Sequence, residues 1–460
     1  MARSIHFEIS ERKILLRVID VLVVLSGLHL IGMFFHFDYF LINEQHWFWS
    51  VIFATYLLFF ATIFELYNLN RASRINSTLK SIFSTTATTS LFYLLTPFFT
   101  PLLPQNRLQI VYFTITIALM LILWRTLYIK LFTSSRFNKN ILLVGEREEA
   151  EAMAQSLREV DPHFNVIGFI NTVSEAKARG ENKLRELKPE IARRMLARTG
   201  IKEIIVGTDT NGFDSQLYKW LLNCMEQGYH VRDYILVYED MTDSVPLEVI
   251  GRDFYRHFPF SRSNQNQLYR VYHRAFDIVA SIIGLTVGLL FLPFVLIGNL
   301  IGNRGPLFYS QERLGKNRKP FKILKYRSMV TNAESKGAQY AQKNDARITA
   351  FGKFLRKSRL DEFPQFINIL KGEMSIIGPR PERPMFVKEL SSKIPYYETR
   401  NMVKPGLTGW AQVKGKYGET DDDHREKLRY DLYYIKKRSI SLDVRIIVKT
   451  VSTIVFFKGQ

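Results

Sequence analysis

The segment KFLRKSRLDEFPQFINILKGEMSIIGPRPE, residues 353–382, combines adjacent carboxylates, clustered cations and turns stiffened by proline. Its two carboxylates, Asp361 and Glu362, follow a run of arginine and lysine. Its last residues, Gly378–Glu382, contain two prolines and are expected to form a rigid loop that carries Arg380. The guanidinium of arginine is suited to bidentate capture of phosphate. Phosphoryl transfer needs such parts close together, because it uses a nucleophile or a metal ligand together with cations that neutralise charge.

A short helix is expected directly after the carboxylates. Pro364 is tolerated in the first turn of a helix, so we place Asp361 at the N-cap, the helix over residues 365–370, and Gly372 near its end. The unpaired N–H groups and the positive dipole of a helix start would keep Asp361 ionised and attract a phosphate or its metal ion. The plainer alternative is a solvated Asp–Glu pair that only caps the helix.

The composition indicates a membrane protein with two or three domains. The chain has 460 residues, and its 47% of hydrophobic residues are unevenly distributed. The net charge is +20, and residues 301–460 hold most of it, with 33 Lys and Arg against 16 Asp and Glu. Anionic partners are therefore expected for this part: lipid headgroups, a nucleotide diphosphate or nucleic acid. The sole cysteine, Cys224, excludes an intramolecular disulfide and fits a reducing compartment.

Four apolar stretches near the N-terminus each approach the length of about 20 residues that a helix needs to cross a bilayer. They cover residues 14–36, 47–67, 79–100 and 109–131. Cations concentrate before the first stretch, between the second and the third, and around the end of the fourth. The positive-inside rule therefore predicts four transmembrane helices over residues 1–135, with the N-terminus and everything after residue 132 in the cytoplasm.

Residues 136–250 alternate predicted strands and helices, which is typical of a parallel, Rossmann-like sheet. A buried strand over residues 140–144 ends at Gly145, where a dinucleotide-binding turn would need further glycines. Charged residues follow Gly145 instead, and their carboxylates would repel a pyrophosphate. We therefore interpret this part as a structural or dimerising α/β module. Residues 251–274 mix aromatics and arginines, which fits an interfacial linker; a plain linker is the alternative.

Residues 275–303 contain a fifth apolar stretch that does not fit a simple span. Cations flank it on both sides, so both of its ends favour the cytoplasm. Pro293 lies inside it, and proline removes a helix hydrogen bond and bends the helix. We predict a re-entrant membrane helix that enters and leaves on the cytoplasmic face, with a helix break at Pro293. An ordinary fifth span is the alternative.

Residues 304–460 are expected to form a mostly helical cytoplasmic domain. Two of its residues outside the opening segment are candidates for contacts to substrate phosphate. Arg313, next to Glu312, forms either an ion pair or a substrate contact, and the sequence leaves this open. Lys325 lies within residues 321–329, where apolar and basic residues alternate as in a strand or the rim of an anion site.

From Arg274 to the last residue, the chain resembles the bacterial sugar transferase family, the monotopic polyprenyl-phosphate glycosyl-1-phosphate transferases. The matching stretches are RAFD at 274–277, GPLFYSQERLGKNRKPFKILKYRSM at 305–329, LRKSRLDEFPQ at 355–365, IIGPRPE at 376–382 and VKPGLTGWAQV at 403–413. One departure is visible, because this chain has Leu292-Pro293 where small members have a Ser-Pro pair. The N-terminal part resembles the large subgroup that initiates exopolysaccharide, colanic-acid-type or O-antigen repeat units.

The resemblance implies that a UDP-sugar and undecaprenyl phosphate react to give undecaprenyl-diphosphate-sugar and UMP, with Mg²⁺ as cofactor. Asp361 matches the family's nucleophile, which forms a phosphosugar–aspartyl intermediate, and Glu362 matches its partner in the dyad. Both carboxylates are candidate metal ligands. Arg356 and Arg380 match the arginines of the family's phosphate site. Because the resemblance is to the large subgroup, UDP-glucose or UDP-galactose is the expected donor.

The expected location is the bacterial inner membrane, with the catalytic domain on the cytoplasmic face and in contact with membrane lipids. We expect a homodimer formed through the α/β module. A membrane scaffold or nucleotide sensor without catalysis is the alternative from another class, and the glycine-poor turn at Gly145 counts against it. No nucleic acid is expected as a partner, because the cations are interleaved with Pro-Gly turns and carboxylates and no nucleic-acid motif is present.

Overall fold

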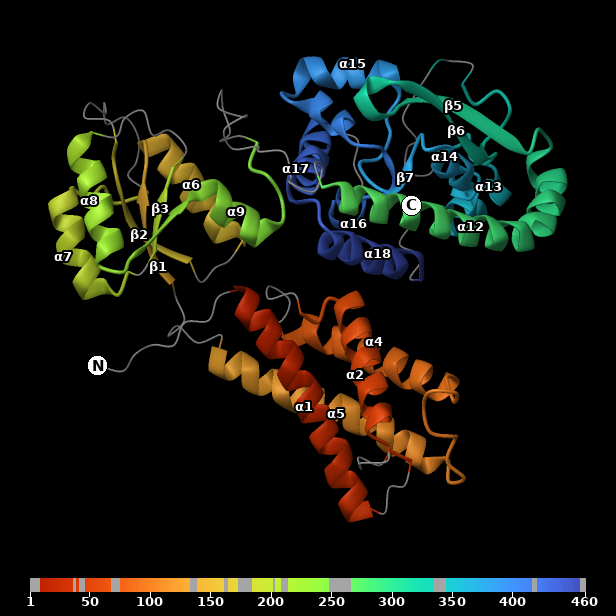
Figure 1. Cartoon of the computed structure of the whole chain (residues 1–460), viewed down its shortest axis with the longest axis horizontal. Helices are drawn as coiled ribbons and strands as arrows, with labels where there is room; N and C mark the ends of the chain where they lie inside the picture. The colour runs from red at the N-terminus through yellow and green to blue at the C-terminus, as the bar shows by residue number, and fades with distance from the viewer. Residues whose placement is uncertain are drawn as a thin grey trace. The chain divides into compact units, whose positions relative to one another are not determined.

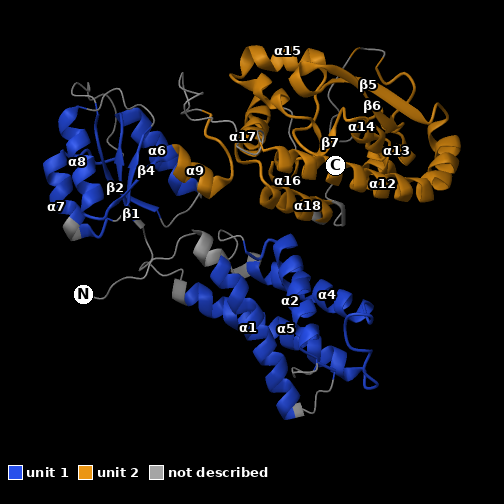
Figure 2. Cartoon of the chain, viewed as in Figure 1, with its two compact units in different colours: residues 1–234 blue, residues 235–460 orange. Residues whose placement is uncertain are grey.

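The computed structural model divides the chain into two compact units, residues 1–234 and residues 235–460 (Figure 2). The structure describes residues 9–35, 39–40, 46–67, 75–132, 139–160, 164–172, 184–201, 203–207, 214–247, 266–334, 337, 345–415 and 420–455. Most of the expected interfacial linker, residues 251–265, therefore lies outside the described residues.

Four helices of the first unit pack around a shared apolar core (Figure 1). They are α1 (Ile9–Phe35), α2 (Trp47–Ile63), α4 (Ile75–Leu95) and α5 (Leu108–Phe132). Among the described residues, three segments are long and apolar enough to cross a membrane: Ile14–Phe34, Leu108–Lys130 and, in the second unit, Gln267–Asn303. Helix α2 is shorter than this and α4 is rich in threonine, so a bundle of four spans stays a prediction.

An ion pair is buried between α1 and α5. Arg125 donates to Oδ2 of Asp20 at 2.6 Å, and both side chains are at most 1% exposed. The guanidinium of Arg125 also lies 5.5 Å from the ring centroid of Tyr67, a favourable cation–π distance. Because breaking a buried pair leaves an uncompensated charge, the pair ties the packing of α1 to that of α5.

A small parallel sheet forms the other part of the first unit. Its strand order is β2 (Phe164–Ile170), β1 (Lys139–Val144), β3 (Glu203–Val206) and β4 (His230–Asp233). Helices α6 (Arg147–Val160), α7 (Pro189–Thr199) and α8 (Ser215–Glu226) alternate with these strands along the chain. The predicted alternation of strands and helices is therefore confirmed, and so is the parallel pairing.

A carboxylate lies at the turn after β1. The Glu149 carboxylate lies so close to Gly145 and Gly207 that a Cβ atom added to either glycine would collide with it. These glycines directly follow β1 and β3, at the strand ends where a dinucleotide fold accepts its pyrophosphate. A carboxylate in this place supports the structural interpretation of the α/β module.

The described residues of the second unit are mostly helical and include two small two-stranded sheets. Its elements are α12 (Gln267–Gly298), η3 (Asn299–Asn303), β5 (Phe308–Leu314), η4 (Lys316–Arg318), β6 (Pro320–Tyr326), α13 (Ala350–Lys357), η5 (Leu360–Glu362), α14 (Gln365–Lys371), β7 (Ser375–Ile377), α15 (Pro384–Lys393), η6 (Tyr397–Met402), β8 (Gly406–Thr408), α16 (Trp410–Lys414), α17 (Asp421–Lys437) and α18 (Ile440–Val455). Strands β5 and β6 are antiparallel, whereas β7 and β8 are parallel. The hydrophobic core of the second unit includes Trp410, which is fully buried.

Pro293 lies inside a continuous stretch of assigned helix, and the helix break expected there stays a prediction. Helix α12 continues through Pro293 to Gly298, and the π-helical turn η3 follows before Arg304 leaves the helix in a left-handed conformation. A proline removes only one hydrogen bond from the ladder, so a helix bends there instead of ending when its other bonds persist. Figure 1 shows the last part of this helical segment turning away from its first part before it reaches β5. The re-entrant path itself stays a prediction.

Residues 235–247 belong to the second unit, although they precede the segment that resembles the family. Helix α9 (Tyr234–Thr242) places Glu239 against Lys436, with 2.5 Å between Oε1 and Nζ, and Glu239 is fully buried. The side chain of Asp243 accepts hydrogen bonds from Lys414 at 3.1 Å and from Arg445 at 2.9 Å. These contacts fix α9 to helices α16, α17 and α18.

Replacing Glu239 by Gln is expected to destabilise the second unit. The change leaves the ammonium of Lys436, only 7% exposed, without its counter-charge, and such a loss costs about 3 kcal/mol, which corresponds to a fall in melting temperature of about 5–10 °C. Thermal unfolding of the purified protein in detergent measures this. The matched control is Glu226→Gln, which removes one exposed charge from α8. An equal melting temperature for both variants would show that the Glu239 pair contributes nothing.

Candidate active site

The two adjacent carboxylates are buried in a single turn of 3₁₀ helix. This turn is η5, and the exposed fractions of Asp361 and Glu362 are 6% and 7%. Arg359 precedes the turn with φ of 61°, a left-handed conformation that residues with a side chain rarely adopt. Strain of this kind persists only where surrounding contacts over-determine it, and it is concentrated at functional sites.

The helix after the carboxylates begins later than its predicted cap. Helix α14 covers Gln365–Lys371 and ends at Gly372, whose φ is 84°, so both the helix and its end are confirmed. Asp361, however, is not the N-cap of α14, because Pro364 holds that position. The reason is local: Phe363 donates to the carbonyl of Leu360 at 3.2 Å and closes a separate turn before α14.

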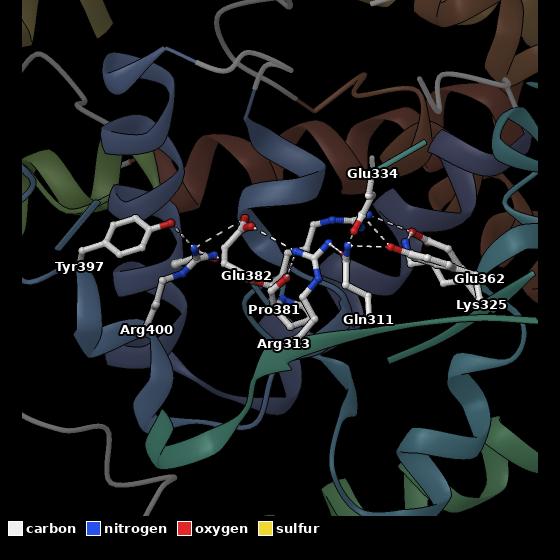
Figure 3. Close-up of polar contacts among 12 residues, drawn as sticks. Gln311, Arg313, Lys325, Glu334, Glu362, Pro381, Glu382, Tyr397 and Arg400 are labelled. Atoms are coloured by element: carbon white, nitrogen blue, oxygen red, sulfur yellow. Dashed lines mark hydrogen bonds and ion pairs between the residues drawn. The ribbon is translucent and has the colours of Figure 1, made fainter. Parts of the chain in front are cut away.

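Three cations from three parts of the chain converge on Glu362. Lys325 of β6 lies 3.4 Å from Oε1, Arg380 of the loop after β7 donates to the same oxygen at 3.0 Å, and Arg359 donates to Oε2 at 3.2 Å. Figure 3 shows the Lys325 contact to Glu362. The structure therefore brings Lys325 and Arg380 to the dyad, and their predicted role in binding substrate phosphate stays a prediction.

The two carboxylates of the dyad differ in their proton affinity. Burial, aided by the negative charge of Glu362, raises the pKa of Asp361 to about 6, although Lys325 and Arg356 oppose this. Burial also disfavours ionised Glu362, but Arg380, Lys325 and Arg359 outweigh it and hold the pKa of Glu362 well below its usual value. Near neutral pH both groups are ionised, and Asp361 is the more basic of the two.

Arg356, predicted to bind phosphate, lies at the end of α13 beside the dyad. Its Nε donates to the Ser328 hydroxyl at 2.9 Å, and its positive charge acts on both Asp361 and Asp345. A guanidinium held in this way adds to the positive potential around Asp361. The residue as a whole is partly exposed.

Arg313 makes contacts within the protein. Its NH1 donates to the carbonyl of Pro381 at 3.1 Å and lies 3.4 Å from the Glu382 carboxylate, and its NH2 donates to Gln311 at 2.6 Å (Figure 3). Of the alternatives left open by the sequence, an ion pair is therefore present, but its partner is Glu382 and not the adjacent Glu312. Arg313 thus stiffens the Gly378–Glu382 loop from the β5 side.

A second buried network, which was not predicted from the sequence, holds the same loop through Arg400. Arg400 donates to the carbonyl of Arg380 at 3.0 Å and to Asp431 at 2.8 Å. It also donates to the Tyr397 hydroxyl at 2.6 Å (Figure 3). Burial raises the pKa of Asp431 to about 6, even though Arg400 favours its ionised form. No local spacing links Arg400 to Asp431, whereas the spacing of three between Arg359 and Glu362 was a usable signal.

The donor set of the site fits a metal ion that is bound mainly by substrate and water. Within the described ranges, no cluster of three or more His, Cys, Asp or Glu side chains could form a cage for a metal ion. The carboxylate of Asp361 forms no hydrogen bond or ion pair with another residue that the structure describes. Mg²⁺ commonly uses one or two carboxylates together with substrate phosphates, and the dyad offers this.

Comparison with known proteins adds a family match over the second unit. The model of the family described as "Bacterial sugar transferase" matches residues 268–457. The exopolysaccharide production protein PSS of Rhizobium leguminosarum bv. phaseoli is 41% identical over 190 residues, which cover 39% of this chain and 94% of the relative.

Longer relatives share only part of their length with this chain. The UDP-N-acetylgalactosamine-undecaprenyl-phosphate N-acetylgalactosaminephosphotransferase of Aeromonas hydrophila is 46% identical over 190 residues, 41% of this chain and 44% of the relative. The UDP-glucose:undecaprenyl-phosphate glucose-1-phosphate transferase of Escherichia coli K12 is 40% identical over 192 residues, 41% of this chain and 40% of the relative. The match thus spans less than half of each of these two relatives.

Proposed function

The chain belongs to the bacterial sugar transferase family, and from this premise we propose that it transfers a sugar 1-phosphate from a UDP-sugar to undecaprenyl phosphate and releases UMP. The observation that carries the proposal is the buried dyad, in which Glu362 binds three cations and Asp361 is left available. The relatives named as undecaprenyl-phosphate sugar phosphotransferases support this reaction class. UDP-glucose and UDP-N-acetylgalactosamine are the donors in the names of those relatives, so both belong in the donor panel with UDP-galactose.

Asp361 acts as the nucleophile in the proposed mechanism. Its carboxylate oxygen attacks the phosphorus that carries the sugar, the bond from this phosphorus to the bridging oxygen breaks, and UMP leaves with that oxygen. An oxygen of undecaprenyl phosphate then attacks the same phosphorus, and the bond to Asp361 breaks to restore the carboxylate. Two displacements at one phosphorus let a single nucleophile serve two dissimilar substrates in turn.

The cations around the dyad stabilise the charge that moves during each displacement. Arg380 is the most exposed partner of Glu362, with 42% of its side chain accessible, and its loop is fixed by Arg313 and Arg400. Arg356 adds charge beside Asp361. Fixed cations need no reorganisation when charge develops on the phosphoryl oxygens, and this lowers the barrier.

Mg²⁺ fits this site as a bound cofactor. Asp361 and Glu362 would hold it together with the diphosphate. The ion would supply charge neutralisation on the diphosphate and so favour departure of UMP. The protein's own part is to keep both carboxylates fixed on η5 and, through Lys325 and Arg380, to keep Glu362 ionised.

The proposal extends to the arrangement in the membrane. Three candidate spans support a membrane protein, and we propose a four-helix transmembrane bundle, a Rossmann-like module and a re-entrant α12 in the bacterial inner membrane. The site would then face the cytoplasm, where the UDP-sugar is dissolved, at the depth of the lipid phosphate. A homodimer formed through the α/β module completes the proposal.

The test is a UMP-release assay on the purified full-length protein in nanodiscs, with a panel of UDP-sugars, undecaprenyl phosphate and Mg²⁺. Sustained release that requires both substrates and one donor, and stops when EDTA is added, supports the assignment and identifies the sugar. The absence of release with every donor would overturn the assignment and favour a membrane scaffold or nucleotide sensor.

The rate of UMP release is expected to fall as the pH decreases through about 6. Burial and Glu362 raise the pKa of Asp361 to about 6, and only the carboxylate form attacks phosphorus, so protonation below this value removes the nucleophile. Initial rates at saturating substrate and Mg²⁺ provide the measurement. A rate that stays constant down to about pH 4, near the ordinary pKa of aspartate, would contradict the assigned environment of Asp361.

A further inference from the structure

Arg274 of α12 binds the C-terminal end of the helix that follows the dyad. Its NH1 donates to the carbonyl of Ile369 and its NH2 to the carbonyl of Leu370, both at 2.7 Å. The last carbonyls of a helix have no partner within it and form the negative end of its dipole. A guanidinium satisfies two of them at once, so Arg274 holds α14 by its end.

Asp277, three residues along the same helix, binds the strand that leads to Arg380. Its Oδ1 accepts hydrogen bonds from the Ser375 hydroxyl and from the backbone N–H of Ile376, both at 2.9 Å. Asp277 is 2% exposed and Ser375 is also 2% exposed. Hydrogen bonds to a buried carboxylate are strong because no water competes for them, so β7 is held firmly on α12.

Close packing between α12 and α14 supports the same attachment. A Cβ atom on Gly284 would collide with the ring of Phe366, and one on Gly288 would approach Phe363 to 2.9 Å. Both phenylalanines lie just beyond the dyad in sequence. The glycines therefore let α12 approach the dyad segment more closely than any other residue would allow.

We propose that Arg274 and Asp277 are positioning residues that set the distance between the nucleophile and the phosphate-binding loop. The inference rests on the proposed function. Arg274 fixes α14, whose preceding turn carries Asp361, and Asp277 fixes β7, whose following loop carries Arg380. Both act from one turn of the apolar helix α12, which therefore joins the two halves of the site and ties them to the membrane-associated segment.

The test is the steady-state kinetics of Arg274→Gln in the full-length protein. We expect kcat to be lower by about 10- to 100-fold, because a displacement of about 1 Å in a catalytic group costs this much, while the KM for the UDP-sugar changes less than about twofold. Arg274→Lys keeps the charge but not the two parallel donors, so it should restore only part of kcat. Arg270→Gln, an exposed cation one turn earlier on α12, is the matched control and should behave like the wild type.

Two results would overturn the inference. One is a wild-type kcat for Arg274→Gln; the other is a kcat loss that disappears when rates are divided by the amount of folded protein measured by gel filtration. If Arg274→Gln does not fold, the kcat and KM of Arg274→Lys are compared with those of the wild type instead. Hydrogen exchange of the α14 and β7 amides should be faster in Arg274→Gln whether or not the wild type releases UMP, so failure of the positioning role is distinguishable from failure of the proposed reaction.

Discussion

Asp361→Asn is expected to lower kcat for UMP release by about 10⁴-fold or more, since the amide cannot attack phosphorus. The side chain is nearly isosteric with aspartate and its surroundings are unchanged, so folding should be retained. Intact-protein mass spectrometry of the wild type, incubated with donor but no undecaprenyl phosphate, should show an added mass equal to the phosphosugar. The same incubation of Asp361→Asn should show none.

Asp345→Asn provides the matched control for this prediction. Asp345 is also buried near Arg356, but it pairs with Arg347 at 2.6 Å and not with the dyad. Its amide variant should keep both the adduct and turnover. An adduct that persists in Asp361→Asn would move the nucleophile to another residue, and retained turnover without any adduct in the wild type would favour direct attack by the prenyl phosphate.

Glu362→Gln is expected to lower kcat by about 100-fold and to change the pH profile. The neutral amide leaves Lys325, Arg359 and Arg380 without the anion on which they converge. The negative charge of Glu362 also raises the pKa of Asp361. Its removal should therefore lower that pKa and move the acid limb of the rate profile to lower pH.

The direction of this pH shift separates two roles for Glu362. If Glu362 acts mainly by holding cations and by its charge on Asp361, the acid limb moves down as the rate falls. A reduced rate with an unmoved acid limb would contradict this electrostatic coupling. Glu334→Gln is the matched control, because Glu334 also binds an arginine, Arg383 at 3.0 Å, but is more exposed and lies outside the dyad.

The parts of the site that were predictable from sequence depend on local signals. Helix 365–370 and its end at Gly372 follow from proline and glycine preferences, which act within a few residues. The start of α17 shows a local signal of the same kind, because Thr420 and Asp423 cap it with a reciprocal pair of hydrogen bonds. The predicted N-cap role of Asp361 was wrong. A 3₁₀ turn and the helix α14 meet at Pro364, and residue preferences alone do not show where the first of these elements ends.

The parts that were not predictable depend on contacts between distant residues. Arg400 binds Asp431 across 31 residues and Arg380 across 20 residues, and no periodicity in the sequence reveals such pairing. The choice of Glu382 over Glu312 as the partner of Arg313 has the same origin, since neighbours in a strand point to opposite faces.

The buried pair between Asp20 and Arg125 has a consequence for the biogenesis of the protein. If α1 and α5 span the membrane as proposed, α1 would emerge long before α5 during synthesis. Asp20 would then enter the translocation machinery without its partner, and a lone charge within a span is costly. Integration of α1 should therefore be completed only when α5 arrives, and the two helices would enter the lipid as a couple. Chains that stop before Arg125 would carry an unpaired acid in α1, which quality-control proteases could recognise.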